Sequence, residues 1–351
     1  MVIIVSQPGY STAGRAARGP SPEVRTLRRI GVKIYQRSIV QASPHPRPDV
    51  IRRVFVALAI ASGLLGRGTA LAQVPFVPTP VEVVERMLAM AKVTKADYVI
   101  DLGSGDGRVV RMAAQKYGAR GFGVDLDAEL VARSNSLARR DGVSDRVSFL
   151  AQDLFATDIS EATVLTMYLL PAVNMQLRAR LIAELKPGTR IVSHDFDLGD
   201  WAADETAKMY AKEKYGGSGG DSTIHLWFVP AQAAGRWQWR LNFAGSAIDY
   251  ELALKQQFQK IEGELRGAGR EAKIEAAELR GDRIRFVAVI EVKGRPVRHA
   301  FSGRVAGDAI DGDVELTGAR IQGAHQWSAT RTQRGATYIN QAANAAAGAR
   351  W

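Results

Sequence analysis

The pattern of apolar and polar positions divides the chain into two parts with different periods. Between residues 98 and 229, short continuous apolar runs alternate with segments in which apolar positions recur every three or four residues. Such runs predict buried parallel strands, and the segments between them predict amphipathic helices. From residue 235 the period changes to two, which predicts antiparallel strands with one buried face. We therefore predict an α/β domain with a doubly wound, mostly parallel sheet, followed by a small all-β domain, an antiparallel barrel or sandwich.

The segment from Tyr98 to Asp127 carries the clearest candidate chemistry. An apolar run contains Asp101, glycines follow at alternate positions from 103 to 107, a helical pattern comes next, and a second apolar run ends in Asp125. Glycines let the backbone turn tightly and approach a ligand, and a helix start offers free N–H groups. An acid after the second strand typically accepts hydrogen bonds from ribose hydroxyls. The segment therefore predicts a site for a nucleotide cofactor.

The spacing of these glycines separates two classes of cofactor. The dinucleotide fingerprint G-x-G-x-x-G would need glycine at the position of Arg108. The spacing D-x-G-x-G-x-G instead resembles motif I of the class I S-adenosylmethionine-dependent methyltransferases, which have a Rossmann-like fold. The resemblance implies S-adenosylmethionine as the cofactor, held at its methionine part by Asp101, Gly103 and Gly105, at its ribose by Asp125 and at its adenine by Asp153. The alternative for Asp153 is a plain loop cap.

A proline-rich segment precedes this motif. The sequence PFVPTP at residues 75–80 predicts an extended stretch, with Thr79 as the cap of a helix whose first residue is Pro80. Together with DLGSGDGR, the segment resembles the seven-strand protein lysine methyltransferases related to the mitochondrial ATP-synthase c-subunit lysine methyltransferase. Archaeal broad-specificity lysine methyltransferases share the pattern. The resemblance covers residues 74–205 and implies that Thr79 lies near the methionine end of the cofactor and that a protein lysine accepts the methyl group.

Two strand ends are predicted to form the acceptor site. Many amino- and amide-methylating relatives have an Asn/Asp-Pro-Pro-aromatic motif after the fourth strand, whereas this chain has Tyr168-Leu169-Leu170-Pro171, which argues against methylation of bases and glutamine. Tyr168 is predicted to line the acceptor channel, with burial in the core as the alternative. Asp195 and Trp201 follow the fifth strand and are predicted to shape the acceptor pocket. Tyr168 and Asp195 are thus the predicted catalytic residues, and no dedicated general base is assigned.

Metal and thiol chemistry receive no support from the sequence. One histidine and three aspartates lie close together in HDFDLGDW at residues 194–201. Methyl transfer needs no metal, however, and no second histidine recurs at ligand spacing, so no metal site is predicted. The chain has no cysteine, which excludes disulfides, thiolate metal sites and a cysteine nucleophile.

The C-terminal part is predicted to form its own core. Trp237 and Trp239 alternate with polar residues, and turn signals recur, for example at Gly281-Asp282 and Gly307-Asp308. Trp237, Trp239 and Trp327 are expected in this core rather than on a sugar- or peptide-binding platform. The predicted domains are a methyltransferase domain at 73–232, with a flexible loop at 216–221 and a closing strand at 223–229, an antiparallel β domain at 233–331 and a disordered tail at 332–351.

The N-terminal part carries the marks of an export signal. Arg52 and Arg53 precede an apolar run at 54–65, and Ala70-Leu71-Ala72 fits a small-x-small cleavage site before Gln73. Residues 51–72 are therefore predicted to be a signal peptide, partly matching the twin-arginine type, and the protein to be periplasmic or exported. Residues 1–50 are predicted to be a disordered or misassigned upstream extension. The alternatives are a membrane-anchored protein, or a cytoplasmic one if the segment is not processed.

The distribution of charge bears on partners. Residues 1–67 hold 11 of the 47 basic residues and 2 of the 36 acidic ones, so the net charge of +11 falls to +2 from residue 73 onward. This distribution argues against a nucleic-acid partner. We expect an S-adenosylmethionine-dependent methyltransferase without a stable transmembrane span after removal of the signal peptide, acting on protein lysine. The alternatives are a small-molecule or lipid methyltransferase, and an exported non-catalytic binding protein that keeps the fold. The oligomeric state is not indicated by the sequence.

Overall fold

The computed structural model describes residues 77–243, 245–318 and 321–336. The predicted upstream extension and signal peptide, the first two residues of PFVPTP and the C-terminal residues from 337 lie outside the described residues. Two folded parts are described in turn, an α/β domain and a C-terminal β module.

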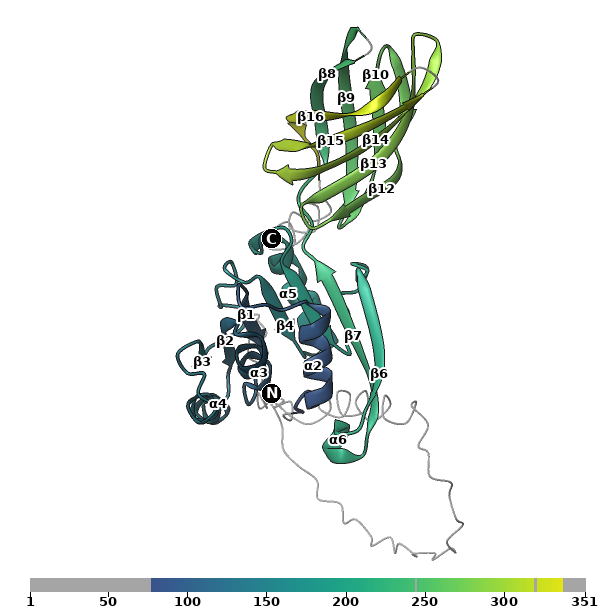
Figure 1. Cartoon of the computed structure of the whole chain (residues 1–351). Coiled ribbons are helices and arrows are strands. Elements are labelled where there is room, and N and C mark those ends of the chain that lie inside the picture. The colour runs from purple at the N-terminus through teal and green to yellow at the C-terminus, as the bar shows by residue number, and fades with distance from the viewer. Residues whose placement is uncertain (1–76, 244, 319–320, 337–351) are drawn as a thin grey trace, which may run out of the picture. The chain divides into compact units, whose positions relative to one another are not determined.

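The α/β domain contains a seven-stranded sheet in the order β3-β2-β1-β4-β5-β7-β6 (Figure 1). In chain order its elements are α2 (Val81–Met90), β1 (Tyr98–Leu102), α3 (Arg108–Tyr117), β2 (Arg120–Asp125), α4 (Ala128–Arg140), β3 (Val147–Ala151), β4 (Val164–Met167), α5 (Pro171–Glu184), β5 (Arg190–His194), β6 (Glu205–Ala211), α6 (Lys214–Gly217) and β7 (Gly220–Phe228). Strands β1 to β5 pair in parallel, whereas β7 pairs antiparallel with both β5 and β6. The carboxyl ends of the five parallel strands therefore meet at one edge of the sheet.

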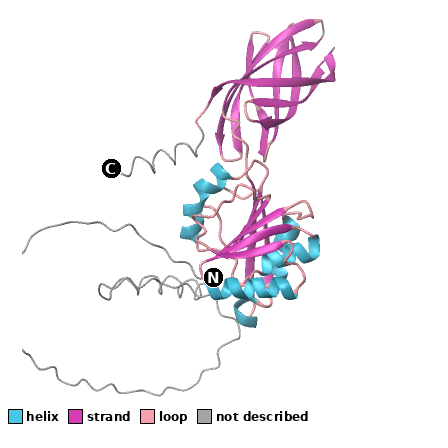
Figure 2. Ribbon diagram, turned by 90° about the vertical axis from the view of Figure 1, so that its left-hand side faces the viewer, coloured by secondary structure: helices cyan, strands magenta, loops and turns pink. Residues whose placement is uncertain are grey.

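The sheet separates two apolar cores. Apolar residues of α2, α3 and α4 form one core, and those of α5 form the other. Figure 2 shows helices beside both faces of the strands. Strand β1 serves both, since Val99 faces the first core and Ile100 and Leu102 belong to the second. This double burial explains the continuous apolar runs of the parallel strands and confirms the predicted doubly wound, mostly parallel sheet.

Helix α2 begins differently from its prediction. Pro80 is the N-cap and no side chain caps the helix, so the predicted cap by Thr79 is wrong. The Thr79 hydroxyl contacts His194 instead, 115 residues further along the chain. The buried face of α2 is formed by Val83, Val84, Met87 and Leu88, whereas Val81 is 42% exposed.

The edge hairpin β6–α6–β7 was only partly predicted. A closing strand at 223–229 corresponds to β7, which begins earlier, at Gly220. Within the predicted flexible loop at 216–221, the structure places Gly216 and Gly217 at the end of α6 and Gly220 and Asp221 at the start of β7, and its flexibility stays a prediction. Strand β6 was not predicted, since as an edge strand it is half-exposed and lacks the continuous apolar run of a central strand.

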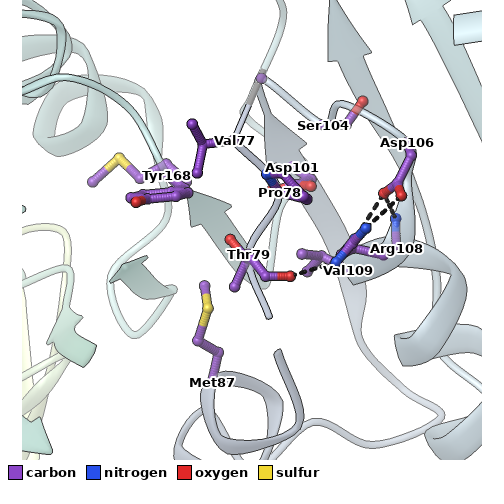
Figure 3. Close-up of a pocket in the computed structure, with 12 residues that line it drawn as sticks. Val77, Pro78, Thr79, Met87, Asp101, Ser104, Asp106, Arg108, Val109 and Tyr168 are labelled. Atoms are coloured by element: carbon purple, nitrogen blue, oxygen red, sulfur yellow. Dashed lines mark hydrogen bonds and ion pairs between the residues drawn. The ribbon is translucent and has the colours of Figure 1, made fainter. Parts of the chain in front are cut away.

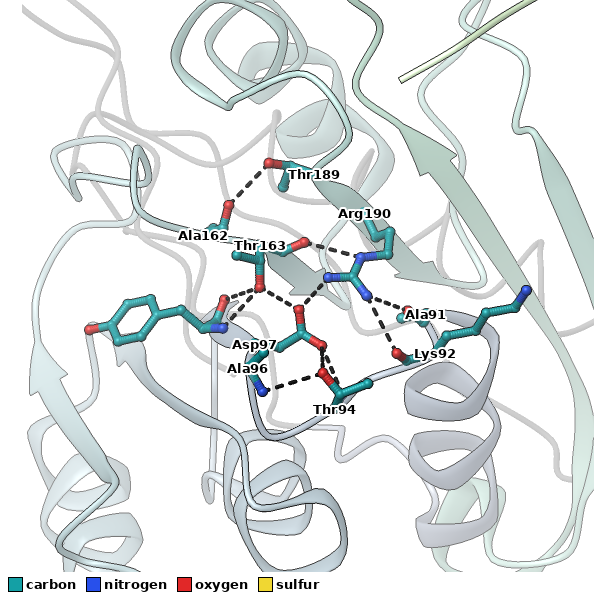
Figure 4. A network of polar contacts seen from close by, with 10 residues as sticks. Ala91, Lys92, Thr94, Ala96, Asp97, Ala162, Thr163, Thr189 and Arg190 are labelled. Atoms are coloured by element: carbon teal, nitrogen blue, oxygen red, sulfur yellow. Dashed lines mark hydrogen bonds and ion pairs between the residues drawn. The ribbon is translucent and has the colours of Figure 1, made fainter. Parts of the chain in front are cut away.

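A polar network ties the strands together at the amino-terminal edge of the sheet (Figure 4). The Asp97 carboxylate forms an ion pair with Arg190 and accepts hydrogen bonds from the Thr163 hydroxyl at 2.7 Å and from the Thr94 N–H at 2.7 Å. Burial opposes the charge of Asp97, but the hydrogen bonds from Arg190 and Thr163 keep its pKa below the usual value. Arg190 also donates to the Ala91 carbonyl at the end of α2. This network therefore joins the starts of β1, β4 and β5 to the end of α2.

The C-terminal β module is a single antiparallel sheet of nine strands in the order β11-β10-β9-β8-β16-β15-β14-β13-β12. The strands are β8 (Gly235–Phe243), β9 (Ser246–Gln257), β10 (Lys260–Gly267), β11 (Arg270–Lys273), β12 (Glu275–Arg280), β13 (Arg283–Val292), β14 (Arg295–Ala306), β15 (Ala309–Gly318) and β16 (Ile321–Arg334). The two ends of the order, β11 and β12, are consecutive in the chain, and the sheet curls into a near-barrel (Figure 1). Of the two predicted architectures, the structure is nearer to the barrel than to the sandwich, although β11 and β12 are not paired with each other.

Alternation fills the interior of this near-barrel with apolar side chains. Strand β8 alternates strictly between buried and exposed residues from end to end. Trp237, Trp239 and Trp327 are all buried, which confirms their predicted place in the core. The Tyr250 hydroxyl and the buried His299 form a hydrogen bond of 2.8 Å, and the indole N–H groups of Trp237 and Trp327 donate to backbone carbonyls, whereas that of Trp239 is buried without a partner. Strand β16 continues to Arg334, beyond residue 331 where the β domain was expected to end.

Helix lengths bear on membrane insertion. The longest helix in the described part of the chain, α5, has 14 residues, and no described helix is both long and apolar enough to cross a bilayer.

Candidate active site

A pocket opens at the carboxyl ends of β1 and β4, between the segment before α2 and the glycine loop after β1 (Figure 3). Its lining includes four of the predicted site residues, namely Thr79, Asp101, Gly103 and Tyr168. The other predicted residues lie outside the lining: Asp125 and Asp195 connect to the site through hydrogen bonds to Gly105 and Tyr168, whereas Asp153 contacts only its own turn. The pocket is therefore at the strand ends where the sequence predicted it.

The glycine loop is bent and close-packed in a way that needs glycine. Gly103, Gly105 and Gly107 have φ values of 76°, 56° and 74°. A Cβ atom on Gly107 would lie 2.5 Å from the ring of Phe149, so a side chain there would require the ring to move. The N–H groups of Gly103 and Ser104 both donate to the Val124 carbonyl, at 2.9 and 2.8 Å, which ties the loop to β2.

Asp125 organises this loop from the end of β2. One of its carboxylate oxygens accepts the Gly105 N–H at 2.9 Å, and the other accepts the Asp127 N–H at 3.1 Å. The Asp125 side chain is buried, so these bonds satisfy a charge that would otherwise be costly to bury. Its predicted contact with ribose remains a prediction.

Asp101 is the buried acid of the pocket. Its carboxylate accepts a hydrogen bond from the Thr166 hydroxyl at 2.7 Å and is only 4% exposed. Burial raises the pKa of the Asp101 carboxyl to about 7, with smaller contributions in the same direction from Asp125 and Asp106. Asp101 therefore responds strongly to any charge that enters the pocket.

Asp153 has a different environment from the other two acids. It is exposed beyond β3, and its carboxylate accepts the Phe155 N–H at 2.8 Å. This local turn is what a loop cap would form, and the contact with adenine remains a prediction.

Thr79 is held over the pocket by two contacts that join distant segments. Arg108 donates to the Thr79 carbonyl at 2.8 Å while its guanidinium also binds both carboxylate oxygens of Asp106 (Figure 3). The Thr79 hydroxyl lies 3.2 Å from His194 Nδ1, and His194 Nε2 lies 3.0 Å from the Ser222 hydroxyl. Burial lowers the pKa of His194 to about 4, so its imidazole is neutral at physiological pH.

Sequence reasoning missed the roles of Arg108 and His194. Arg108 was used only to exclude the dinucleotide fingerprint. The signal that could have identified it is the acid two residues earlier, Asp106, since Asp-x-Arg at a helix start favours a local ion pair. The partner of His194 could not have been found from spacing, because Thr79 lies in another element.

Tyr168 connects the pocket to Asp195. Its ring lines the pocket and its hydroxyl donates to Asp195 Oδ2 at 3.3 Å. The Tyr168 and His194 ring centroids are 4.1 Å apart. Burial and the Asp195 charge raise the pKa of the Tyr168 phenol, so it remains protonated and can donate. The two predicted catalytic residues are thus in contact, although their catalytic role stays a prediction.

Two other residues differ from expectation. Trp201 was expected at the acceptor pocket but is fully buried, and its carbonyl accepts a hydrogen bond from Trp227 at 2.8 Å, so it belongs to the core. Lys214 was not predicted at the site, yet its ammonium lies 2.7 Å from Asp195 Oδ2. Within the residues that the structure describes, no three His, Asp or Glu side chains converge in a way that could hold a metal ion.

The strand order and the loop after β1 define the class of protein. Five parallel strands, an antiparallel pair at one edge and the sequence D-x-G-x-G-x-G after β1 are the arrangement of the class I S-adenosylmethionine-dependent methyltransferases, and the chain is an enzyme of this class. Its cofactor is S-adenosylmethionine.

Comparisons with known proteins identify the family. The family model described as the ANTKMT methyltransferase domain matches residues 101–205. A protein-lysine N-methyltransferase of Saccharolobus islandicus (strain REY15A) is 45% identical over 137 residues, which are 39% of this chain and 85% of that protein. The ATP-synthase c-subunit lysine N-methyltransferase of Xenopus laevis is 30% identical over 176 residues, 48% of this chain and 77% of that protein. The chain belongs to the family of these methyltransferases.

Solved structures are also similar to this chain. An RNA methyltransferase from Salinibacter ruber, in complex with S-adenosyl-L-homocysteine, is 51% identical, covers 44% of this chain and 94% of its own, and superimposes with a TM-score of 0.41.

Proposed function

We propose that this enzyme N-methylates lysine side chains of proteins. The observation that carries the proposal is the acceptor end of the pocket, where Tyr168 and Asp195 are joined by a hydrogen bond and the Asn/Asp-Pro-Pro-aromatic motif of base and glutamine methylation is absent from the turn after β4. Relatives in Saccharolobus islandicus and Xenopus laevis that are named lysine N-methyltransferases support lysine as the acceptor.

The residues of the pocket suit S-adenosylmethionine. Asp101 offers a buried carboxyl for an ammonium group, and Gly103, with a φ of 76°, lets the backbone approach a ligand without a Cβ atom in the way. In the proposal, the methionine part is held by Asp101, Gly103 and Gly105 with Thr79 near its end, the ribose by Asp125 and the adenine by Asp153. The cofactor supplies an activated methyl group on a sulfonium sulfur.

Catalysis then depends mainly on alignment. The residues that would hold the cofactor would place its methyl group in line with the lone pair of a neutral lysine amine, and the methylated amine would release its proton to solvent. Such alignment of two reactants is worth up to about 7 to 11 kcal/mol. Free lysine has a pKa of about 10.4, so the acceptor must lose its proton before it reacts, and an apolar, aromatic-lined channel favours this loss. The ring of Tyr168 would form one side of such a channel.

Transfer of a labelled methyl group to defined acceptors tests the proposal. The full chain would be incubated with methyl-labelled S-adenosylmethionine and, separately, poly-L-lysine, a protein extract of its own cells, a lipid extract, a small-metabolite fraction and RNA. We expect label in poly-L-lysine and protein, recovered as methyllysine after acid hydrolysis, and none in Nε-acetylated poly-L-lysine. Label confined to lipid, metabolites or RNA would replace lysine with that acceptor. Cofactor binding without any transfer would favour the non-catalytic binding protein.

Export forms a separate part of the proposal. The arginine pair at Arg52-Arg53, the apolar run at 54–65 and the small residues before Gln73 support a processed, periplasmic or exported form. N-terminal sequencing of the protein from fractionated cells tests this part, with a start near Gln73 expected. A cytosolic protein with an intact N-terminus would overturn it.

A further inference from the structure

Lys214 is a buried cation at the acceptor end of the site that the mechanism above leaves unused. It begins α6 at the tip of the edge hairpin and is only 3% exposed. Its ammonium lies 2.7 Å from Asp195 Oδ2 and also donates to the Asp221 carbonyl. A buried ammonium is stable only where it is paired, so Lys214 and Asp195 depend on each other.

Asp195 is held in an unusual conformation by its surroundings. Its φ of +62° lies in the left-handed region, which non-glycine residues seldom adopt. Its Oδ1 accepts the Thr223 N–H at 3.0 Å, and its Oδ2 is shared by Lys214 and the Tyr168 hydroxyl. Contacts from three elements therefore fix the carboxylate that orients Tyr168, and local strain of this kind is common at functional sites.

This arrangement creates an electrostatic problem for lysine methylation. A carboxylate close to the acceptor stabilises the ammonium form of lysine and so raises its pKa. Each pKa unit lowers the fraction of reactive neutral amine about tenfold at pH values below the pKa. An unpaired Asp195 would thus orient Tyr168 correctly but hold the acceptor in its unreactive form.

The other titratable groups facing the Asp195–Lys214 pair carry little charge of their own. They are Tyr168 at the end of β4, His194 on β5, Tyr215 on α6, and His225 on β7. Burial raises the pKa values of the two phenols and lowers those of the two imidazoles, which favours the neutral form of all four. On the cofactor side, Asp101 and Asp106 face the pocket, and Asp106 is paired with Arg108. The charged Asp197, Lys208 and Asp221 near the pair are exposed, so solvent screens them, and the balance at the acceptor end depends mainly on Asp195 and Lys214.

We propose that Lys214 is a positioning residue whose ammonium neutralises Asp195, so that Asp195 can orient Tyr168 without holding the acceptor amine in its charged form. The inference rests on the proposed lysine methylation. It assigns Lys214 no contact with the substrate and no proton transfer. Its effect reaches the acceptor through the electrostatic field of the Asp195 carboxylate.

The pH profile of turnover tests this inference. The full chain and the variants Lys214→Met, Lys214→Arg and Asp195→Asn/Lys214→Met would be compared with saturating methyl-labelled S-adenosylmethionine and poly-L-lysine between pH 6 and 10. In Lys214→Met we expect the rise of kcat to move to higher pH by about one unit or more, which lowers kcat about tenfold near pH 7.5 and less at pH 10. Lys214→Arg keeps the charge and should restore the wild-type midpoint. In the double variant, position 195 no longer carries a carboxylate. The midpoint of its pH profile of kcat should therefore equal that of the wild type, even if its maximal rate is lower.

Calorimetry with S-adenosylmethionine serves as the control for folding, since Lys214 does not line the cofactor pocket and cofactor affinity should stay within about twofold of wild type. A Lys214→Met enzyme that is slower by the same factor at every pH would show that Lys214 acts only through packing and would overturn the inference. If Lys214→Met does not fold, a double variant with a midpoint above that of the wild type would overturn it as well. A wild-type enzyme that methylates neither poly-L-lysine nor protein would instead overturn the proposed function, and the inference with it.

Discussion

Asp101 is buried and also lines the pocket, so both burial and a bound ligand affect the protonation of its carboxyl. Its pKa of about 7 in the free protein means that the carboxyl is largely protonated below pH 7. A cationic ammonium bound beside it would favour the ionised form, so binding below pH 7 must release a proton. We expect the affinity for S-adenosylmethionine to weaken about tenfold for each unit of pH below 7.

Calorimetry between pH 5.5 and 7.5 measures this effect directly. The variant Asp101→Asn has no proton to release, and its weaker affinity should vary little over the same range. Wild-type affinity that is constant with pH would show that Asp101 does not face the ammonium group.

Asp125 holds the glycine loop and is the predicted ribose acceptor, so one substitution removes both groups of contacts. Asp125→Ala deletes the predicted ribose acceptor and also leaves the Gly105 N–H without its partner. Hydrogen bonds to charged groups contribute about 1.5 to 3 kcal/mol each, so we expect cofactor binding to fall below detection by calorimetry. Asp125→Asn keeps one carbonyl oxygen and should retain weak binding. An unchanged affinity in Asp125→Ala would contradict the assignment of Asp125.

At the scale of elements, His194 links the segment before α2 to strands β5 and β7. Its imidazole contacts the Thr79 hydroxyl on one side and the Ser222 hydroxyl on the other, inside the core. The folded-state pKa of about 4 lies below the ordinary value of 6.5. The stability that this difference provides is therefore complete above pH 6.5 and is lost as the pH falls through 4.

Urea denaturation at several pH values tests this dependence. Between pH 6.5 and 4, the wild-type protein should lose on the order of 3 kcal/mol more of its free energy of unfolding than His194→Gln, which cannot become charged. Other carboxylates titrate in the same range, but they do so in both proteins and cancel in the difference. Parallel curves for the two proteins would contradict a neutral, buried His194.

The elements that sequence reasoning found and missed differ in one physical respect. The central strands could be predicted because burial on both faces leaves a continuous apolar run, and the β module because its alternation is strict, as in β8. Strand β6 was not predicted, because a half-exposed edge strand lacks the continuous apolar run of a central strand. Thr79 was predicted to cap α2 because Thr-Pro before a helix favours such a cap. In the structure its hydroxyl instead contacts His194, 115 residues further along the chain. Lys214 was missed for the same reason, since a buried lysine depends on an acid in another element.

At the scale of the whole α/β domain, the amino ends and the carboxyl ends of the parallel strands hold different polar groups. Asp97 and Arg190 join the amino ends, whereas the pocket lies at the carboxyl ends. Breaking a largely buried ion pair leaves a charge without compensation. We expect Asp97→Asn to lower the free energy of unfolding by about 2 to 4 kcal/mol.

Cofactor affinity should be unaffected by this substitution at temperatures where the variant is folded. Urea denaturation and calorimetry on the same preparation measure the two effects separately. A variant with normal stability but weak cofactor binding would show that the Asp97 network reaches the pocket.

The separation of these ends has a consequence for how such an enzyme can change. The turns after β4 and β5 and the hairpin tip that carries Lys214 can accept substitutions without disturbing the Asp97 network that joins the strand starts. A lineage, or a designer, could therefore exchange the methyl acceptor by changing the exposed and partly exposed residues of these three segments while retaining the same scaffold. Directed libraries over residues 168–171, 195–201 and 212–219 that leave the buried Leu169, Leu198, Trp201 and Lys214 unchanged are the natural place to look for new acceptors.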